Sequence, residues 1–446
     1  MSPGSATIAA IATPPGTGGI AIVRVSGPDA PAIARRLTDR RNLAPNTIHR
    51  CALYSADRTQ KLDDGLLAFF QAPHSYTGED VAEFNCHGSD WLARKILEQC
   101  LLSGARLSAP GEFTRRAFLA GKLDLTQAEA VAELISAGGE LSLALALRHL
   151  EGDVSAGIKN LRAEFLAALA GLEAALDYPE EIDAPAPAGI INLLQAAQRQ
   201  VAQLLADSSR GLLIKSGANI VLAGKPNSGK SSLFNALLKY DRAIVTEIPG
   251  TTRDALEAEV SLGGLRVNLI DTAGLREAAD QIERLGIERS RAHMQSAELV
   301  LFLLDAETGL TPAERQILAD LEGTRHLVLI NKCDLPHSLD YPGALPVSAR
   351  TGANLDLLEQ KILESLNLRN IDLSKKVYIS SLRQKDRLIR AAELIARTLE
   401  SSQTVAYLDL LAAPLKAIVV TLGELTGEET SAEIIEEIFA NFCVGK

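Results

Sequence analysis

The chain has 446 residues, of which 47% are hydrophobic and 23% charged, and its formal net charge is −11. This composition excludes an intrinsically disordered chain, and the acidic balance excludes a protein that coats nucleic acid through its overall field. Aromatic residues make up only 4%, so the core must consist of aliphatic side chains, which favours helices and parallel sheets over an all-β sandwich.

The sequence contains no apolar run near the ~20 residues that a membrane-spanning helix needs, and its first residues lack the basic segment of a secretory signal. The five cysteines are odd in number and form no Cys-x-x-Cys pair. That pattern argues against a disulfide framework and against a structural zinc site. We therefore expect a cytoplasmic protein without a membrane span.

The first predicted domain, residues 1–120, contains short β-branched runs such as Ile20-Ala21-Ile22-Val23-Arg24-Val25, separated by glycine and proline, which predicts a mixed α/β fold. Residues 121–216 predict the first part of a helical domain, because apolar residues recur at three- and four-residue spacing. Three prolines between residues 178 and 188 predict a turn, and residues 190–207 predict the next helix.

The pattern changes in residues 217–372, where apolar runs bounded by loop residues alternate with helical segments. These runs predict buried parallel strands at 219–223, 267–270, 299–304 and 327–330. Residues 373–446 are again helical, with a single proline, Pro414. The sequence thus predicts a multidomain α/β and all-α protein, in which an α/β domain is inserted into a discontinuous helical domain.

A phosphate-binding loop marks the inserted domain. Residues 224–231, Gly-Lys-Pro-Asn-Ser-Gly-Lys-Ser, match GxxxxGK[ST] between a predicted strand and a predicted helix. Backbone N–H groups of such a loop converge on phosphate oxygens, and the helix N-terminus adds a positive dipole end. Lys230 would supply its charge to the β- and γ-phosphates, and the Ser231 hydroxyl can bind Mg²⁺. The domain is therefore expected to be a Ras-like P-loop G domain.

Three further motifs favour GTP over ATP. The first, Asp271-Thr272-Ala273-Gly274, follows a predicted strand and places a carboxylate near the metal and an N–H near the γ-phosphate. The second, Asn331-Lys332-Cys333-Asp334, supplies a carboxylate that can accept from N1–H and the exocyclic amine of guanine, a donor pair that adenine lacks. The third, Ser348-Ala349-Arg350, offers backbone N–H groups to guanine O6.

Gly250-Thr251-Thr252-Arg253 supplies a hydroxyl for Mg²⁺, and of its two threonines we choose Thr252. The residues predicted to contact GTP all lie in or beside these motifs. They are Asn227, Ser228, Gly229, Lys230, Ser231, Ser232, Thr246, Glu247, Ile248, Pro249, Gly250, Thr251, Thr252, Asp271, Thr272, Ala273, Gly274, Asn331, Lys332, Asp334, Ser348, Ala349 and Arg350.

The group that activates water is less obvious. Ras-like proteins place a Gln after DxxG, but here that position holds Leu275, which cannot hydrogen-bond water. Glu283 is the best nearby carboxylate, although the local sequence favours a solvated helix-face charge. Arg253 and Arg276 are alternative charge donors or ion-pair partners. Asn227 could offer an oxygen to a monovalent cation placed where an arginine finger would put its charge.

Seven stretches carry a resemblance to a known family. They are IAAIATPPGTGGIAIVRVSG near the start, APHSYTGEDVAEFNCHG at 72–88, PGEFTRRAFLAGKLDLTQAEAV at 110–131, GKPNSGKSSLFNALL at 224–238, IPGTTRD at 248–254, DTAGLRE at 271–277 and the terminal FCVGK. With them the chain closely resembles the MnmE (TrmE) family, the tRNA-modifying GTPases of bacteria and organelles, over essentially its whole length.

The resemblance implies a homodimer joined through the N-terminal domain, which in the family binds a reduced folate, 5,10-methylene- or 5-formyl-tetrahydrofolate. It implies an FAD-containing partner of the MnmG (GidA) family and a heterotetramer with it. This complex adds an aminomethyl or carboxymethylaminomethyl group to C5 of the wobble uridine (position 34) of certain tRNAs. It also implies K⁺-dependent GTP hydrolysis that is driven by dimerisation of G domains.

The resemblance also assigns roles to residues. The Mg²⁺ ligands are Ser231 and Thr252; the K⁺ ligands are Asn227, Thr246, Ile248 and Thr251; the folate-contacting residues are Arg24, Glu83, Lys122 and Lys446. Glu283 matches the family's catalytic glutamate and Cys443 the cysteine needed for tRNA modification, and Arg276 remains a third catalytic candidate on its charge.

Residue chemistry allows plainer alternatives for the N-terminal site. Arg24 lies between two valines of a predicted strand, where its head could be solvated, and Lys122 could merely begin a helix. Cys443 could be a small buried hydrophobic residue, or a nucleophile with a depressed pKa.

A second function, a GTP-dependent ribosome-assembly switch without chemistry on RNA, also fits the phosphate loop. The N-terminal domain and Cys443 favour tRNA modification.

Overall fold

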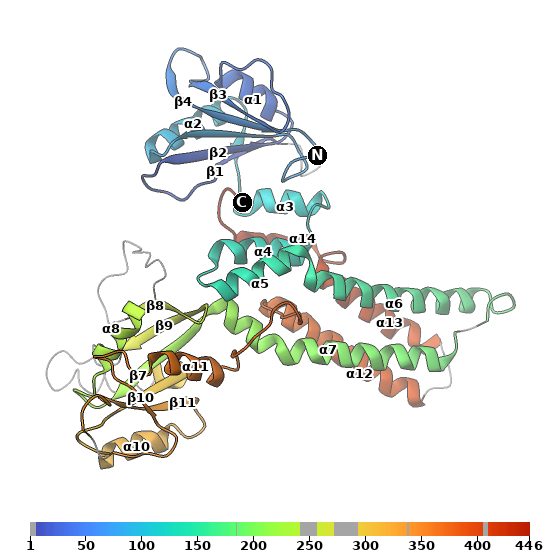
Figure 1. The fold of residues 1–446 in the computed structure, drawn as a ribbon. Coiled ribbons are helices and arrows are strands. Elements are labelled where there is room, and N and C mark those ends of the chain that lie inside the picture. Colours follow the sequence, from blue (N-terminus) through green and yellow to red (C-terminus); the bar gives the residue numbers. More distant parts are fainter. Residues whose placement is uncertain (1–5, 184, 241–256, 272–292, 337–338, 405–408) are drawn as a thin grey trace, which may run out of the picture. The chain divides into compact units, whose positions relative to one another are not determined.

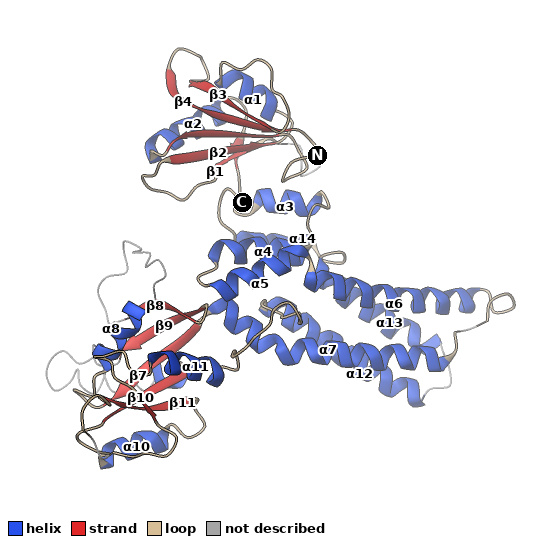
Figure 2. Cartoon of the chain, in the orientation of Figure 1, coloured by secondary structure: helices blue, strands red, loops and turns tan. Residues whose placement is uncertain are grey.

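The computed structural model describes residues 6–183, 185–240, 257–271, 293–336, 339–404 and 409–446. The chain forms two compact units. The first unit combines Met1–Ala132, His149–Leu194 and Leu394–Lys446, and the second combines Glu133–Arg148 and Gln195–Glu393. Each unit contains one β-sheet, drawn in red in Figure 2.

The first unit begins with a six-stranded sheet in the order β3-β4-β5-β2-β1-β6 (Figure 1). Its strands are β1 (Ile8–Ile11), β2 (Ile20–Ser26), β3 (Thr47–Tyr54), β4 (Lys61–Phe70), β5 (Val81–His87) and β6 (Arg106–Leu107). Neighbouring strands are antiparallel except β1 and β6, which are parallel. This sheet confirms the mixed α/β fold predicted for the N-terminal residues.

Two helices, α1 (Ala30–Leu37) and α2 (Asp90–Leu102), pack on one face of this sheet. In β2 the residues Ala21, Val23 and Val25 are buried in the core that these helices cover. Successive side chains of a strand point to opposite faces, so Arg24 emerges on the other face. The alternation in the sequence therefore decides which side of the sheet carries its polar residues.

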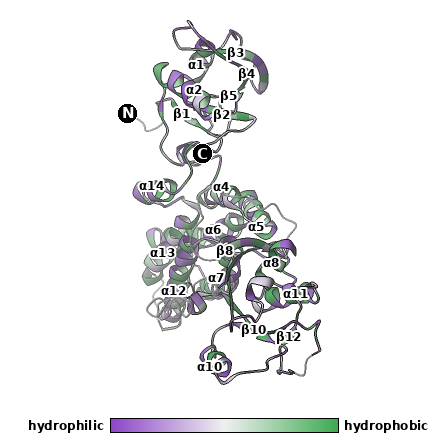
Figure 3. Ribbon diagram, turned by 90° about the vertical axis from the view of Figure 1, so that its left-hand side faces the viewer, coloured by the Kyte–Doolittle hydropathy of each residue, from purple (hydrophilic) through white to green (hydrophobic). Residues whose placement is uncertain are grey.

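Helix α3 (Glu112–Leu119) lies within the predicted N-terminal domain. The predicted helical domain is confirmed by the helices α4 (Leu125–Ser136), α5 (Glu140–Glu151), α6 (Asp153–Asp177), α7 (Pro187–Ser216), α12 (Leu382–Thr404), α13 (Asp409–Thr426) and α14 (Ala432–Ala440). Within the first unit α6 packs against α13, and α3 against α14, although these partners lie far apart in the sequence. Figure 3 shows hydrophobic and hydrophilic residues on the same helices.

The turn predicted at residues 178–188 is confirmed, since α6 ends at Asp177 and α7 begins at Pro187. The bounds predicted for the next helix, 190–207, are wrong, because α7 continues to Ser216. Its last turns are kept helical by tertiary packing, with Ile214 buried in the core of the second sheet. No helix among the described residues is both long enough and apolar enough to cross a membrane.

The second unit contains a six-stranded sheet in the order β12-β11-β10-β7-β9-β8. Its strands are β7 (Ala218–Gly224), β8 (Glu257–Leu262), β9 (Leu265–Asp271), β10 (Leu299–Asp305), β11 (His326–Asn331) and β12 (Leu345–Pro346), and three of its helices are α8 (Lys230–Tyr240), α10 (Pro312–Asp320) and α11 (Leu355–Ser365). The four predicted parallel strands are confirmed, and β8 is an additional antiparallel edge strand.

The central strand β10 shows why this sheet is buried on both faces. Leu299, Leu301 and Leu303 belong to the core that α8 and α11 cover, whereas Val300, Phe302 and Leu304 belong to the core on the α10 side. A parallel strand between two helical layers needs such a continuous apolar run. The polar residues of this unit therefore gather where the strands end, at the carboxyl edge of the sheet.

Candidate guanine-nucleotide site and N-terminal arginine site

The phosphate loop connects the end of β7 to the start of α8. Gly229 has φ +92°, and a Cβ there would collide with the Asn331 side chain, so the loop needs glycine at this position. The Lys230 ammonium donates to the Gly224 carbonyl at 2.9 Å and to the Lys225 carbonyl at 2.8 Å. The Ser228 hydroxyl is buried and has no hydrogen-bond partner in the described part of the chain, which suits a group whose partner is a ligand.

The predicted metal position lies beside this loop. The Ser231 hydroxyl donates to Oδ2 of Asp271 at 2.8 Å, and that carboxylate is fully buried at the end of β9. A hydroxyl and a carboxylate are oxygen ligands of the kind that Mg²⁺ prefers. The sequence separates the two residues widely, and the parallel pairing of β7 with β9 brings them together.

Asn331 joins the phosphate loop to the third guanine motif. Its amide Nδ2 donates to the Ser228 carbonyl at 2.9 Å, and its Oδ1 accepts from the Ala349 N–H at 3.1 Å. One of the backbone N–H groups predicted to reach guanine O6, that of Ala349, is therefore already engaged by Asn331. Asn331 thus fixes the phosphate end of the site relative to the base end.

Asp334 has the geometry expected of a base-reading carboxylate. The Ser348 hydroxyl donates to its Oδ1 at 2.6 Å, and the Arg350 guanidinium lies 3.8 Å from its Oδ2. The hydrogen bond from Ser348 holds the pKa of Asp334 below its ordinary value. The carboxylate is consequently ionised at neutral pH and can act only as an acceptor.

Sequence reasoning missed one member of this site, Asp305, at the end of β10. Its Oδ2 lies 2.7 Å from the Lys332 ammonium, and this hydrogen bond raises the pKa of Lys332. Burial raises the pKa of Asp305, but the hydrogen bonds from Lys332 and from the Glu307 N–H, with the charges of Lys332 and Lys225, together outweigh burial, and the net shift is downward. Asp305 and Asn331 are paired in the register of β10 and β11. The signal in the sequence that could have identified Asp305 is that each of these two apolar strands ends in a polar residue.

Many predicted nucleotide-site residues fall outside the described residues. They are Thr246, Glu247, Ile248, Pro249, Gly250, Thr251, Thr252, Arg253, Thr272, Ala273, Gly274, Arg276 and Glu283, and Leu275 lies outside the described residues too. Of the described set, Asn227 has φ +64° and Ser232 lies exposed at the start of α8. The proposed Mg²⁺ and K⁺ ligand sets are thus each described only in part.

A second polar site lies on the sheet of the first unit. Arg24 on β2 is paired in register with Glu83 on β5, and its Nε lies 2.7 Å from Glu83 Oε1. The two side chains are only 16% and 19% exposed, so the alternative of a solvated arginine head is wrong. The Arg24 guanidinium also donates through Nη1 to the Gly445 carbonyl at 3.2 Å, which brings the C-terminal tail to this face.

The tail is held closely enough to require glycine. Gly445 has φ +94°, and a Cβ there would lie 2.5 Å from the Ile11 carbonyl oxygen. The Gly111 N–H donates to the Cys443 carbonyl at 3.3 Å, which fixes the tail from its other side. Cys443 is exposed, so the alternative of a small buried hydrophobic residue is wrong for this cysteine.

Three of the four predicted folate-contacting residues come together at this site. Burial lowers the pKa of Lys446, and the Arg24 charge acts in the same direction while Glu83 opposes it, which places Lys446 near both. Lys122 lies beside the loop that carries Tyr76, with its Cε 3.8 Å from where a Cβ on Gly78 would be. Among the described residues, no hydrogen bond or ion pair joins Lys122 to the other three.

Two aromatic residues that the sequence did not single out lie against Arg24. The Arg24 guanidinium carbon is 6.0 Å from the centre of the Tyr76 ring and 5.7 Å from that of Phe113, within cation–π range. The Tyr76 hydroxyl is 2.9 Å from the Thr114 hydroxyl on α3. The chain therefore surrounds one arginine with a carboxylate, two rings and its own C-terminal tail.

Comparisons with known proteins show the family to which the chain is similar. A family model described as MnmE helical domain matches residues 125–443, and one described as GTP-binding protein TrmE N-terminus matches residues 7–122. The chain is 41% identical to the tRNA modification GTPase MnmE of Carboxydothermus hydrogenoformans, over 99% of both chains. It is also 41% identical to the protein of that name from Aquifex aeolicus, over 98% of this chain and 99% of the other.

Among solved structures the chain is similar to the G domain of the T. maritima FeoB iron transporter, with 28% identity, coverage of 33% of this chain and 98% of that chain, and a TM-score of 0.25. The family matches and the two full-length relatives extend over nearly every residue, from the N-terminal sheet to the C-terminal tail. This chain therefore belongs to the MnmE family of tRNA modification GTPases.

Proposed function

We propose that this chain binds and hydrolyses GTP and that, with an FAD-dependent partner of the MnmG type, it adds an aminomethyl or carboxymethylaminomethyl group to C5 of the wobble uridine (position 34) of certain tRNAs. The observation that supports GTP binding is the pair of hydrogen bonds made by Asn331, which joins the phosphate loop to the Asp334 end of the site. The full-length relatives, named as tRNA modification GTPases, support the tRNA half.

The phosphate end of the site suits GTP with Mg²⁺. In our proposal Ser231, with Thr252, holds the metal, and Asp271 lies next to it. The bound metal would supply positive charge to the β- and γ-phosphate oxygens. Lys230, released from its two carbonyl contacts, would turn its ammonium to the same phosphates. Glu283 and Arg276 remain proposed catalytic residues.

A potassium ion is the proposed substitute for an arginine finger, held by Asn227, Thr246, Ile248 and Thr251. An exchange of K⁺ for Na⁺ should then lower GTP turnover by roughly 10-fold or more and change GTP affinity much less, because a charge placed at the transferring phosphate acts on the transition state. Turnover and affinity should be measured separately in matched chloride salts.

The matched variants are Asn227→Gly and Asn367→Gly. Both asparagines have positive φ, +64° and +58°, so glycine removes the amide without backbone strain. Asn227→Gly should abolish the difference between K⁺ and Na⁺, and the exposed Asn367→Gly should keep it. Equal rates in both salts for the unmodified protein would refute the cation assignment.

The N-terminal site is proposed to bind a reduced folate, as 5,10-methylene- or 5-formyl-tetrahydrofolate. Glu83 could accept from pterin N–H donors, and Arg24 and Lys446 could balance the anionic glutamyl tail. Cys443 lies exposed next to this site and is the proposed reactive thiol for tRNA modification. Lys122 would have to reach the folate from its position beside Gly78.

The proposed assembly is a homodimer joined through the N-terminal domain, acting in the cytoplasm with the MnmG-type protein as a heterotetramer. Dimerisation of the two G domains would drive hydrolysis. The family resemblance supports this assembly.

Mass spectrometry of wobble nucleosides tests the proposed function most directly. A deletion strain should lose the C5 modification, and expression of this chain should restore it. Unchanged wobble nucleosides, together with GTP-dependent co-sedimentation with ribosomes, would instead support a ribosome-assembly switch.

A further inference from the structure

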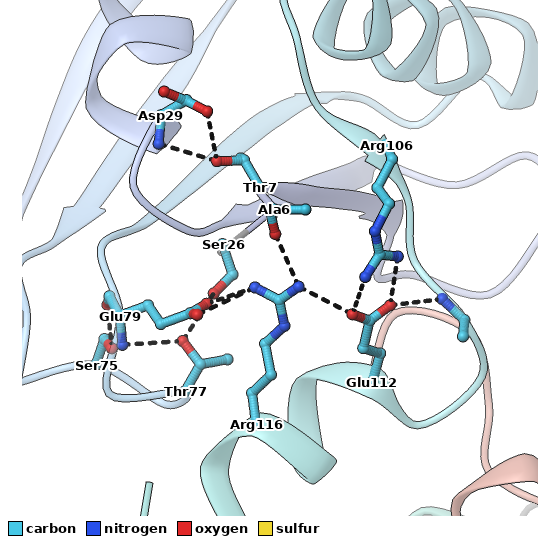
Figure 4. Close-up of polar contacts among 11 residues, drawn as sticks. Ala6, Thr7, Ser26, Asp29, Ser75, Thr77, Glu79, Arg106, Glu112 and Arg116 are labelled. Carbon is cyan, nitrogen blue, oxygen red and sulfur yellow. Dashed lines mark hydrogen bonds and ion pairs between the residues drawn. The ribbon is translucent and has the colours of Figure 1, made fainter. Parts of the chain in front are cut away.

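A buried ionic cluster in the first unit centres on Arg116 of α3 (Figure 4). Its Nη1 donates to both carboxylate oxygens of Glu79, at 2.8 and 3.1 Å. Its Nη2 donates to the Ala6 carbonyl at 2.8 Å and to Glu112 Oε1 at 2.9 Å. The guanidinium therefore bridges the N-terminal segment, the loop before β5 and its own helix.

The cluster extends to β2 through Glu79. The Ser26 hydroxyl, at the end of β2, donates to Glu79 Oε2 at 2.7 Å and lies 2.8 Å from the Thr77 hydroxyl. Ser75 donates through its hydroxyl to the Glu79 carbonyl. The loop from Ser75 to Glu79 is thus tied at several points to the strand and, through Arg116, to α3.

Glu112 anchors the other side of the cluster. It accepts from Arg106 at 2.5 and 2.8 Å, from the Ala109 N–H at 2.9 Å, and from Arg116. Burial raises the pKa of Glu112, but these hydrogen bonds outweigh burial and lower the pKa to about 2. Glu112 is consequently charged at any physiological pH, and it needs its two arginine partners.

The loop and the helix that Arg116 joins, together with strand β2, to which Glu79 ties the loop, also supply the residues around Arg24. Arg24 lies two residues before Ser26 on β2. Tyr76 belongs to the tied loop, and Phe113 with Thr114 lies on the same helix as Arg116. The distances from Arg24 to the two rings therefore depend on how the loop and the helix are held against the strand.

Stability alone does not explain this cluster well. A buried ion pair often contributes no more than apolar residues of the same volume would, because its charges must leave water. The Arg116 Nε is buried and has no hydrogen-bond partner among the described residues, which adds a further cost. The planar Arg116 guanidinium instead fixes the relative positions of the carboxylate and carbonyl groups that accept its hydrogen bonds.

We infer that Arg116 is a positioning residue for the Arg24–Glu83 site: it holds Tyr76 and Phe113 against Arg24 and so keeps the site ready for its anionic ligand. The inference rests on the proposed binding of reduced folate there. Without the hydrogen bonds of the Arg116 guanidinium, the loop from Ser75 to Glu79 could move away from α3. The rings of Tyr76 and Phe113 would then no longer contact the Arg24 guanidinium.

The test uses the full chain, 5-formyl-tetrahydrofolate as the probe, and titration calorimetry. Arg116→Lys keeps the positive charge but cannot bridge the same acceptors, and it should weaken binding about 10-fold, the worth of one or two cation–π contacts. Arg94→Gln is the matched control, since Arg94 of α2 forms an exposed ion pair with Asp90 and belongs neither to the cluster nor to the Arg24–Glu83 site. Its affinity should stay within about 2-fold of the unmodified protein.

A double-mutant cycle separates positioning from a general loss of structure. In a Tyr76→Ala background, Arg116→Lys should have much less effect on affinity than it has alone, because part of its action passes through that ring. Fully additive losses would overturn the inference, as would unchanged affinity of the single variant. If Arg116→Lys fails to fold, Glu79→Gln replaces it, with the same expected loss and the same refutation.

The two proposals fail in different ways. If the unmodified protein does not bind the probe, the proposed folate site is wrong, and the inference falls with it. If the unmodified protein binds and Arg116→Lys binds equally well, only the role of Arg116 is wrong. GTP turnover of each variant should match that of the unmodified protein, because the nucleotide site belongs to the second unit.

Discussion

An Asp334→Asn variant should lose its preference for GTP and gain activity on xanthosine triphosphate. The Asp334 carboxylate can accept from both N1–H and the exocyclic amine of guanine. Xanthine carries a carbonyl oxygen in place of that amine, and an Asn side chain offers one acceptor and one donor to match it. Because hydrogen bonds to a charged group are worth about 1.5–3 kcal/mol each, the loss for GTP should be on the order of 10²-fold or more in kcat/KM.

Steady-state rates with GTP, XTP and ATP at matched Mg²⁺ would measure the switch. The control is Asp320→Asn, an exposed carboxylate in the last turn of α10, which should leave all three rates unchanged. If Asp334→Asn kept the full preference for GTP, Asp334 would not read the base. Ser348 holds Asp334 through Oδ1, so the amide should occupy the place of the carboxylate.

The features that the sequence predicts correctly are local ones. The strand β10 is a continuous apolar run, so its burial between two helical layers follows from composition alone. The phosphate loop is likewise recognisable, because its glycines, Lys230 and Ser231 are consecutive and each has a separate physical reason. The turn between α6 and α7 follows from its prolines.

The features that the sequence does not predict depend on contacts between distant residues. Arg24 meets Glu83 because β2 and β5 pair in one particular register, and a shift by one residue would place the carboxylate on the other face of the sheet. Asp305 meets Lys332 through the register of β10 and β11 in the same way. Local sequence patterns indicate whether a segment is a helix or a strand and which of its faces is buried, but they do not specify which strands become neighbours.

The C-terminal tail combines both cases. The terminal sequence motif, Phe-Cys-Val-Gly-Lys, is recognisable in the sequence, and the family resemblance predicts that Cys443 is functional. Only the structure explains the glycine beside it, since Gly445 must pass the Ile11 carbonyl with positive φ to bring its own carbonyl to Arg24. The tail therefore places an exposed thiol next to a largely buried arginine.

A Cys443→Ser variant should abolish modification of the wobble uridine while GTP hydrolysis stays within about 2-fold of normal. Serine has nearly the same size and leaves the Cys443 carbonyl free to accept from Gly111, so the tail should keep its position. A hydroxyl, however, does not ionise near neutral pH, whereas a thiol supplies an appreciable thiolate. The expected loss is therefore chemical, on the order of 10²-fold or more.

Nucleoside mass spectrometry of a deletion strain that expresses each variant measures modification, and purified protein gives GTP turnover. The matched control is Val444→Ala, which alters the next, exposed side chain of the tail without touching the thiol and should restore modification fully. Modification retained in Cys443→Ser would remove this thiol from the reaction. A parallel loss of GTP hydrolysis would mean instead that the tail acts on the nucleotide site, because a thiol used only on tRNA has no reason to slow GTP cleavage.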